Sequence, residues 1–204
     1  MDFLEIQNFR HACKIFDTNK KISTSDFDYI LECARLSPSS FGMQPWKLIV
    51  IEDEKRKEDI KPLCWNQAQI TSCSQLVIIV ANKDIVEPTN PHVKNMFRSR
   101  GLPQDAVDNY IKLYTDFIES TRQTTGIYNW VSKQCYILLA NIMNAAASLK
   151  IDSCPIEGFH KEKLEKYLEL DTSKEEISVV STFGYRVNEA PEKIRLDINK
   201  IVKR

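Results

Sequence analysis

Several stretches of the chain place apolar residues at every third or fourth position, which is the spacing of helices with one buried face. Residues 3–13 form the first such stretch. Residues 23–26 then offer several side-chain oxygens suited to cap a helix that ends near Pro38. Residues 105–120 have the same spacing, and residues 128–149 are apolar on most faces. We expect the last of these to be a buried core helix, at a domain centre or a subunit interface.

Three shorter runs have the composition of β-strands. Residues 46–52 are rich in strand-forming side chains, and residues 75–81 and 177–183 are largely apolar. Such runs are typical of strands covered on both faces. Two other segments are predicted to be irregular. Residues 84–103 contain three prolines and are expected to be a loop or lid, and the charged tail 188–204 is expected to wrap a partner.

Few strands and many helices favour an α+β architecture over a doubly wound parallel sheet. The chain has 204 residues and no internal repeat, so we expect a single domain over residues 1–204. Only five glycines occur, and neither GxGxxG nor GxxxxGK[ST] is present. A Rossmann or P-loop nucleotide site is therefore not expected.

The charges of the chain are balanced, with 28 Lys plus Arg and 28 Asp plus Glu. A nucleic-acid-binding surface would need excess positive charge, so no nucleic-acid partner is expected. The chain opens without a secretory signal, and no stretch reaches the roughly 20 apolar residues of a membrane span. We therefore expect a cytoplasmic protein with no membrane partner. The six cysteines lack the spacing of zinc ligands, which predicts free thiols and no metal site.

Four separated segments carry recognisable chemistry. They are RHACKIFD at residues 10–17, SPSSFGMQPW at 37–46, CPIEGF at 154–159 and EKIR at 192–195. In this order and spacing they resemble the FMN-dependent nitroreductase family, in its oxygen-insensitive branch, over nearly the whole chain. The resemblance implies a nitroreductase-like fold, in which helices flank a central mixed, mainly antiparallel sheet. It also implies an intertwined homodimer with exchanged C-terminal tails.

The resemblance places FMN contacts along both ends of the chain. The FMN phosphate needs fixed cations or helix N-terminal amides, and the matching residues are Arg10, Lys193 and Arg195. His11 is implied beside the phosphate or ribityl chain. Lys14 is the candidate cation near the N1/O2 edge of the ring, where positive charge favours the reduced form.

A second set of contacts is implied around the rest of the ring. Asn66 matches an asparagine directed at the pyrimidine edge, and the backbone amides of Glu157 and Gly158 match a pair near N5 and O4. A glycine there lets the backbone approach the ring closely. Gln134 is implied to reach the cofactor across the subunit interface. The further contacts implied are the loop Pro38, Ser39 and Ser40, from the other subunit, and Pro155 and Ile156.

Three positions depart from the family pattern. Ala12 stands where a serine often bonds the phosphate, which predicts FMN binding weaker by about 1–2 kcal/mol. Gln69 stands where many members have a second lysine, which predicts a lower flavin potential. Phe41 and Gly42 replace a smaller residue and an amide, and Phe41 could either narrow the substrate face or serve packing. Cys154 is expected near the flavin, and an inert buried thiol is favoured over a redox one.

The resemblance implies an enzyme with ping-pong turnover, in which two electrons pass from NAD(P)H through flavin N5 to nitroaromatics, quinones or flavins. Hydride transfer between stacked rings needs alignment more than an acid or base, so no catalytic residue is expected beyond the flavin, with the Glu157 backbone near N5. Candidate substrate-pocket residues are Phe41, Trp65 and Phe117. The alternatives are a flavin-binding protein without turnover, flavin-dependent dehalogenation or flavin destruction, and a scaffold whose ligand site has decayed.

Overall fold

The computed structural model describes all residues 1–204 and is built on one four-stranded sheet. The strand order is β1-β2-β4-β3, and every neighbouring pair is antiparallel. The α+β expectation is confirmed. The sheet is mainly antiparallel, as expected, and parallel pairing is confined to an isolated bridge between Ala12 and Ser153. The strands are β1 (Trp46–Ile51), β2 (Gln75–Asn82), β3 (Asp152–Ile156) and β4 (Glu175–Gly184).

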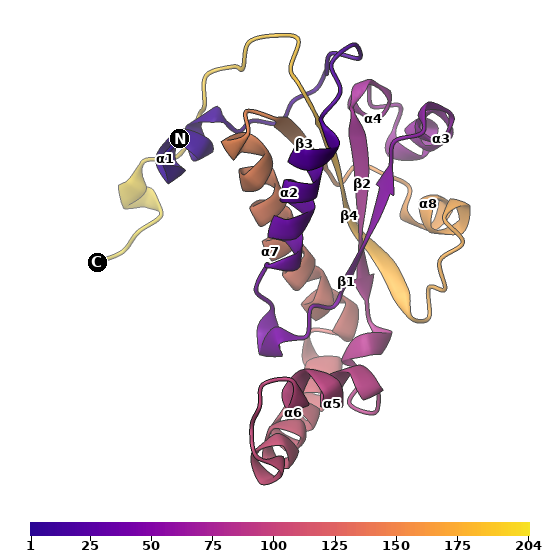
Figure 1. Cartoon of the computed structure of the whole chain (residues 1–204), viewed down its shortest axis with the longest axis vertical. Coiled ribbons are helices and arrows are strands. Elements are labelled where there is room, and N and C mark those ends of the chain that lie inside the picture. The colour runs from indigo at the N-terminus through magenta and orange to yellow at the C-terminus, as the bar shows by residue number, and fades with distance from the viewer.

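Helices cover both faces of this sheet (Figure 1). One face carries α2 and α7, which pack on each other, and the other carries α3, α4 and α8. Each face has its own apolar core, with 26 buried residues on the α2–α7 side and 15 on the other. None of the helices has both the length and the apolar character needed to cross a bilayer. The helices are α1 (Phe3–Phe9), α2 (Thr24–Arg35), α3 (Glu54–Ile60), α4 (Gln69–Ser72), α5 (Pro91–Arg98), α6 (Gln104–Thr124), α7 (Ile127–Ser148) and α8 (Lys161–Tyr167).

Helix α7 is the predicted core helix. It contacts all four strands and α2, and eleven of its side chains are buried. Helix α6 ends directly before it, at a reversal where Gly126 has φ +83°, a backbone conformation that favours glycine. The Gly126 amide donates to the carbonyl of Thr121 and closes the last turn of α6. Only two residues, Thr125 and Gly126, therefore separate the two longest helices.

Helices α5 and α6 project from one end of the molecule as an arm (Figure 1). The expectation of a loop over residues 84–103 is wrong, because much of this segment is helical. Asn90 caps α5 by accepting from the amide of His92, and Pro91 occupies the first helical turn, where its missing N–H costs nothing. Pro103 is the N-cap residue of α6 and lies directly before its first turn. The prolines here begin helices rather than prevent them.

Replacing Tyr114 by Phe is expected to destabilise the arm. The Tyr114 side chain is fully buried, and its hydroxyl donates to the carbonyl of Val86 at 2.6 Å. The substitution leaves that carbonyl without its partner, so the free energy of unfolding should fall by about 1–3 kcal/mol in urea titrations. Tyr110→Phe is the control, since Tyr110 is 42% exposed. Equal stability of both variants would contradict the role of this hydrogen bond.

The C-terminal segment leaves the body of the molecule after β4. It is extended up to a short 3₁₀ turn at Ile198–Lys200, and the chain ends away from the sheet (Figure 1). Its apolar side chains are largely exposed, including Ile194 at 85% and Leu196 at 66%. The apolar side chains of this tail therefore stay outside the core of their own chain.

Candidate functional site

The segment after α1 is joined to the sheet at strand β3. Ala12 bridges to Ser153, and the Cys13 amide donates to the Ser153 carbonyl at 3.1 Å. This pairing brings the start of the chain beside residues some 140 positions later in sequence. The predicted residues Arg10, His11 and Lys14 therefore stand at the same edge of the sheet as the 154–158 segment.

Positive charges gather around Arg10. The ammonium of Lys193 donates to the Arg10 carbonyl, and burial together with Arg10, Arg195 and Arg186 lowers the pKa of Lys193. Arg186 also reaches the Phe9 carbonyl at 3.3 Å and forms an ion pair with the buried carboxylate of Asp152 at 2.5 Å. The predicted cations Arg10, Lys193 and Arg195 thus lie together, where their mutual repulsion would be relieved by a bound anion.

Three buried polar atoms in this region lack a hydrogen-bond partner. They are Nδ1 of His11, Oγ of Ser153 and Oδ1 of Asp152, of which the last is ion-paired with Arg186. His11 Nδ1 lies 3.5 Å from the carboxylate of Asp152, and burial, with Arg186, lowers the pKa of the imidazole. Buried polar atoms are nearly always paired in folded proteins. Unpaired groups among clustered cations fit a ligand that carries phosphate oxygens.

Lys14 stands over the buried thiol of Cys154. Its Nζ is 3.5 Å from Sγ, and Nε2 of the buried Gln69 is 3.8 Å from the same sulfur. Burial raises the pKa of Cys154 although both neighbours lower it. A thiol that is fully buried and protonated is a poor nucleophile, in keeping with the inert role favoured from the sequence.

The Glu157–Gly158 loop is held from three sides. Tyr136 on α7 donates to the Glu157 carboxylate at 2.5 Å, and Gln67 donates to the Gly158 carbonyl at 2.8 Å. The Trp65 ring packs on Gly158 so closely that an added Cβ would lie 2.6 Å from a ring carbon. Gly158 is therefore required by close contact with protein as well as by any approach of the backbone to a ligand.

Trp65 and Asn66 both have a left-handed backbone, with φ of +54° and +55°. Consecutive non-glycine residues in this region carry strain, which is often found at functional sites. Trp65 and Asn66 are both exposed, and Trp65 is 61% exposed. The strained turn places Trp65 against Gly158, with Asn66 next to it in the chain.

A second group of predicted residues lies on the opposite side of α7, near the arm. The Ser40 amide donates to Oε1 of the buried Gln134 at 2.9 Å. Phe41, with φ +53°, packs its ring 5.1 Å from Phe117 and 5.2 Å from Tyr114 between centroids. Phe41 is thus engaged in an aromatic cluster, the packing role that the sequence left open.

The two groups do not meet within one chain. Gln134 and Tyr136 are two residues apart on α7, and a separation of about 200° around the helix points them to opposite sides. Gln134 is held by Ser40 and by its own helix, whereas Tyr136 faces Glu157. Of the three candidate substrate-pocket residues, Trp65 belongs to the first group, and Phe41 and Phe117 belong to the second.

Several contacts of the site were not predicted from the sequence. Arg186 and Ser153 lie with the cations around Arg10. Gln67 and Tyr136 hold the 157–158 loop. For Ser153, the signal available in the sequence was its position directly before the recognisable CPIEGF segment. The other three contact distant segments through single side chains, for which no local pattern exists.

Comparison with known proteins identifies the family of this chain. The model of the nitroreductase family matches residues 8–185. The chain is 39% identical to YfkO of Bacillus subtilis, provisionally named an NAD(P)H nitroreductase, with 98% of this chain and 96% of YfkO covered. A Haemophilus influenzae protein of the same provisional name is 38% identical over 98% and 94% of the two chains. The chain belongs to the nitroreductase family.

Solved structures share the fold. The B. subtilis protein ydfN superposes with a TM-score of 0.90 at 21% identity, covering 100% of this chain and 98% of that one. A structure from Exiguobacterium sibiricum, provisionally named a nitroreductase and solved in complex with FMN, has a TM-score of 0.84 at 25% identity and covers 100% and 97%. The nitroreductase fold expected from the sequence is therefore confirmed.

Proposed function

We propose that this protein binds FMN and is an oxidoreductase that passes two electrons from NAD(P)H to nitroaromatics, quinones or flavins by a ping-pong mechanism. The observation that carries the proposal is the cluster of Arg10, Lys193 and Arg195 beside the unpaired atoms of His11 and Ser153. The family, the provisional names of its relatives and the FMN complex of the E. sibiricum structure support the same reading.

Each part of the site has a task in this function. The cations would hold the FMN phosphate, Lys14 would offset negative charge at the pyrimidine edge together with the amide of Asn66, and the 157–158 backbone amides would stand near N5 and O4. Pro155 and Ile156 precede that loop at the end of β3. FMN would supply the hydride chemistry itself, which needs alignment rather than a protein acid or base.

Anaerobic titration of the purified protein with NADPH tests the function. Bleaching of the two visible flavin bands by about one equivalent per subunit, followed by reoxidation with menadione, is the expected result. Protein that stays colourless after FMN is added would overturn the proposal and favour a decayed scaffold. Reduction without turnover on menadione or a nitrofuran would indicate a flavin-binding protein.

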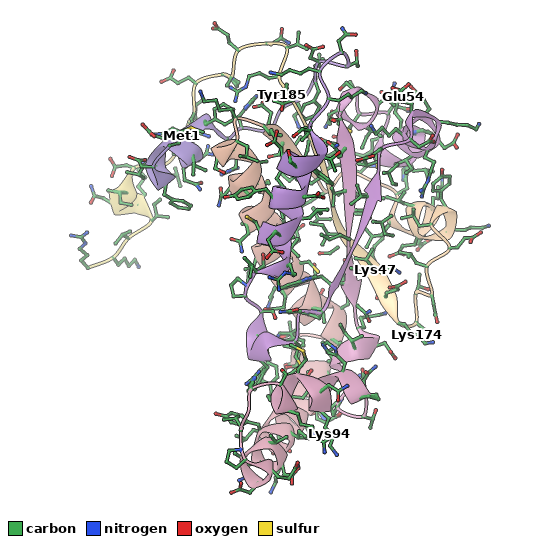
Figure 2. All side chains as sticks on the ribbon, viewed as in Figure 1. Met1, Lys47, Glu54, Lys94, Lys174 and Tyr185 are labelled. Carbon is green, nitrogen blue, oxygen red and sulfur yellow. The ribbon has the colours of Figure 1, made fainter.

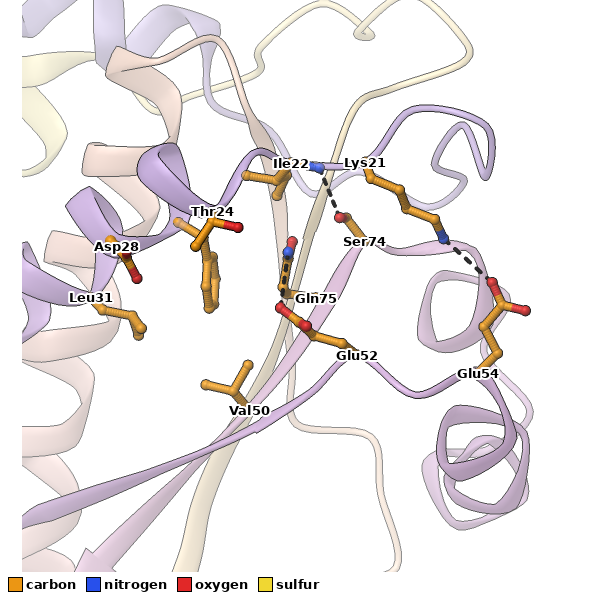
Figure 3. A pocket seen from close by; sticks show the side chains of 11 residues that line it. Lys21, Ile22, Thr24, Asp28, Leu31, Val50, Glu52, Glu54, Ser74 and Gln75 are labelled. Carbon is orange, nitrogen blue, oxygen red and sulfur yellow. Dashed lines mark hydrogen bonds and ion pairs between the residues drawn. The ribbon is translucent and has the colours of Figure 1, made fainter.

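We also propose that the active unit is a homodimer with exchanged tails, since the two groups of site residues are separated in one chain. Pro38, Ser39, Ser40 and Gln134 would then serve the cofactor of the partner subunit. A cavity of about 490 Å³ between α2 and the free edge of β1 is suited to receive the partner's tail (Figure 3). Its walls combine apolar Phe27, Leu31 and Val50 with acidic Asp28, Glu52 and Glu54, the last of which is paired with Lys21 at 3.6 Å.

The tail is complementary to this cavity. Its end alternates apolar Ile198, Ile201 and Val202 with basic Lys200, Lys203 and Arg204. The apolar residues named in it are 43–65% exposed within one chain. Buried apolar surface and opposite charges would together hold the exchanged tail.

Light scattering should give a mass of twice 23.6 kDa for the intact chain. Removal of residues 197–204 is expected to shift the equilibrium toward monomer, because the cavity then loses its apolar occupant. Glu52→Lys should weaken the dimer more at low salt than at high salt, because it places like charges together. Lys94→Glu, on the arm, is the control. A truncated chain that remains fully dimeric at submicromolar concentration would contradict tail exchange.

A further inference from the structure

The amide of Gln67 has only one possible orientation. One of its terminal atoms lies 2.8 Å from the Gly158 carbonyl and 3.1 Å from the Cys64 carbonyl. Two carbonyl oxygens accept hydrogen bonds and do not donate, so that terminal atom must be nitrogen, with its two hydrogens. The oxygen of Gln67 consequently faces the other way, toward Gln69.

The orientation of Gln67 determines that of Gln69. Oε1 of Gln67 accepts only, so the Gln69 atom 2.9 Å away must be its nitrogen. The same nitrogen lies 3.8 Å from Sγ of Cys154, which takes its second hydrogen. Oε1 of Gln69 is the remaining polar atom of the pair. It has no partner within the chain and is not sealed from solvent.

This pair sits between two parts of the site. At one end Gln67 holds the carbonyl of the 157–158 loop, and at the other Gln69 contacts the sulfur under Lys14. Gln69 is 3% exposed, so its side chain is fixed by packing as well as by hydrogen bonds. Both N–H groups of Gln69 are therefore engaged, and the only group that this side chain can still offer to a ligand is an uncharged acceptor.

We infer that Gln67 is a positioning residue that fixes the 157–158 loop and, through Gln69, makes the wall beside Lys14 an acceptor rather than a donor. The inference rests on the proposed function. An acceptor opposes negative charge nearby, whereas Lys14 favours it. Gln67 and Gln69 therefore lower the midpoint potential of bound FMN, and freeing the Gln69 amide to turn its N–H groups outward raises it.

The test compares Gln67→Met with the wild type and with Gln123→Met, whose glutamine is exposed and makes no side-chain hydrogen bond. The first readout is deuterium uptake of peptides covering residues 156–160 in FMN-free protein. The second is the midpoint potential of the FMN-loaded protein, measured by spectroelectrochemical titration. Gln69→Lys, which adds a cation, calibrates the upward direction of the potential. Circular dichroism verifies folding.

Gln67→Met is expected to raise deuterium uptake in this loop and to shift the potential in the direction of Gln69→Lys, by a smaller amount. Unchanged uptake, or a potential that moves downward, overturns the inference. If Gln67→Met does not fold, Gln67→Glu gives the uptake result, because it removes both donors and keeps the acceptor for Gln69. Wild-type protein that binds no FMN would refute the proposed function, and the uptake comparison would still decide the role of Gln67.

Discussion

Gly158→Ala is expected to weaken FMN binding by about 10- to 100-fold, corresponding to the roughly 1–3 kcal/mol cost of overpacking a tight contact. The added Cβ would lie 2.6 and 2.8 Å from two carbons of the Trp65 ring and 3.2 Å from Nε2 of Gln67. Either the ring or the loop must move. If the loop moves, the backbone of Glu157 and Gly158 leaves the position that Gln67 and Tyr136 hold, and if the ring moves, the loop loses the packing of Trp65. Quenching of FMN fluorescence during titration with protein measures the affinity.

Gly101→Ala is the matched control for this variant. A Cβ at Gly101 meets nothing within 4 Å, although its φ of +67° makes alanine less favourable there by roughly 1–2 kcal/mol. This variant tests whether backbone strain at a distant glycine alone weakens binding. Wild-type FMN affinity in Gly158→Ala would show that the contact with Trp65 does not define the site.

The double replacement of Arg10 and Lys193 by Met is expected to have the largest effect on FMN affinity. A hydrogen bond to a charged group contributes about 1.5–3 kcal/mol, so the loss of two should weaken binding by at least about 100-fold. Lys193 lies among positive neighbours that lower its pKa, and removing it also relieves that repulsion. The relief opposes the loss of the hydrogen bond from Lys193 to the Arg10 carbonyl, so thermal denaturation should show only a small change in the stability of the FMN-free protein.

Riboflavin is the decisive control for the cation cluster, because it has the same ring and ribityl chain without the phosphate. Its affinity should be nearly equal in the wild type and the double variant. Lys94→Met, at an exposed position on the arm (Figure 2), should change neither affinity. If riboflavin binding falls as much as FMN binding, the cluster supports the site in some way other than through the phosphate.

Much of the fold could be predicted from the sequence, namely the strands and helices whose buried side chains are mostly apolar. The predicted strands 46–52, 75–81 and 177–183 differ by at most two residues at either end from β1, β2 and β4. The helix predicted at 128–149 coincides with α7 to within one residue. These elements lie in the core, so apolar residues dominate their composition.

Other elements had no such signal. Strand β3 is five residues long and contains Pro155, which is tolerated because this is an edge strand. Helix α3 (EKRKEDI) is almost entirely charged and is stabilised by its cap Asp53 and by the buried Lys57 rather than by an apolar stripe. Such elements depend on tertiary contacts that periodicity does not encode.

The candidate site also has a part that could be predicted from the sequence and a part that could not. Arg10, Lys14, Asn66 and Gly158 were identified because the resemblance rests on residue types in order along the chain. The interactions that fix them depend on side chains far apart in sequence, such as Tyr136 with Glu157 and Gln67 with Gly158. A pattern in one chain does not indicate which glutamine among several will turn toward a given carbonyl.

The burial of the thiols lowers the rate at which oxidants attack them. Five of the six cysteines are buried, and burial raises the pKa of Cys13 to about 11 and that of Cys64 to about 12. At pH 7 a pKa of about 11 leaves roughly one molecule in ten thousand with Cys13 as thiolate, the form that peroxides and disulfides attack. Most thiols of this protein are thus protected from oxidation. The protein should therefore lose little activity through thiol oxidation during exposure to the oxidants that it would reduce.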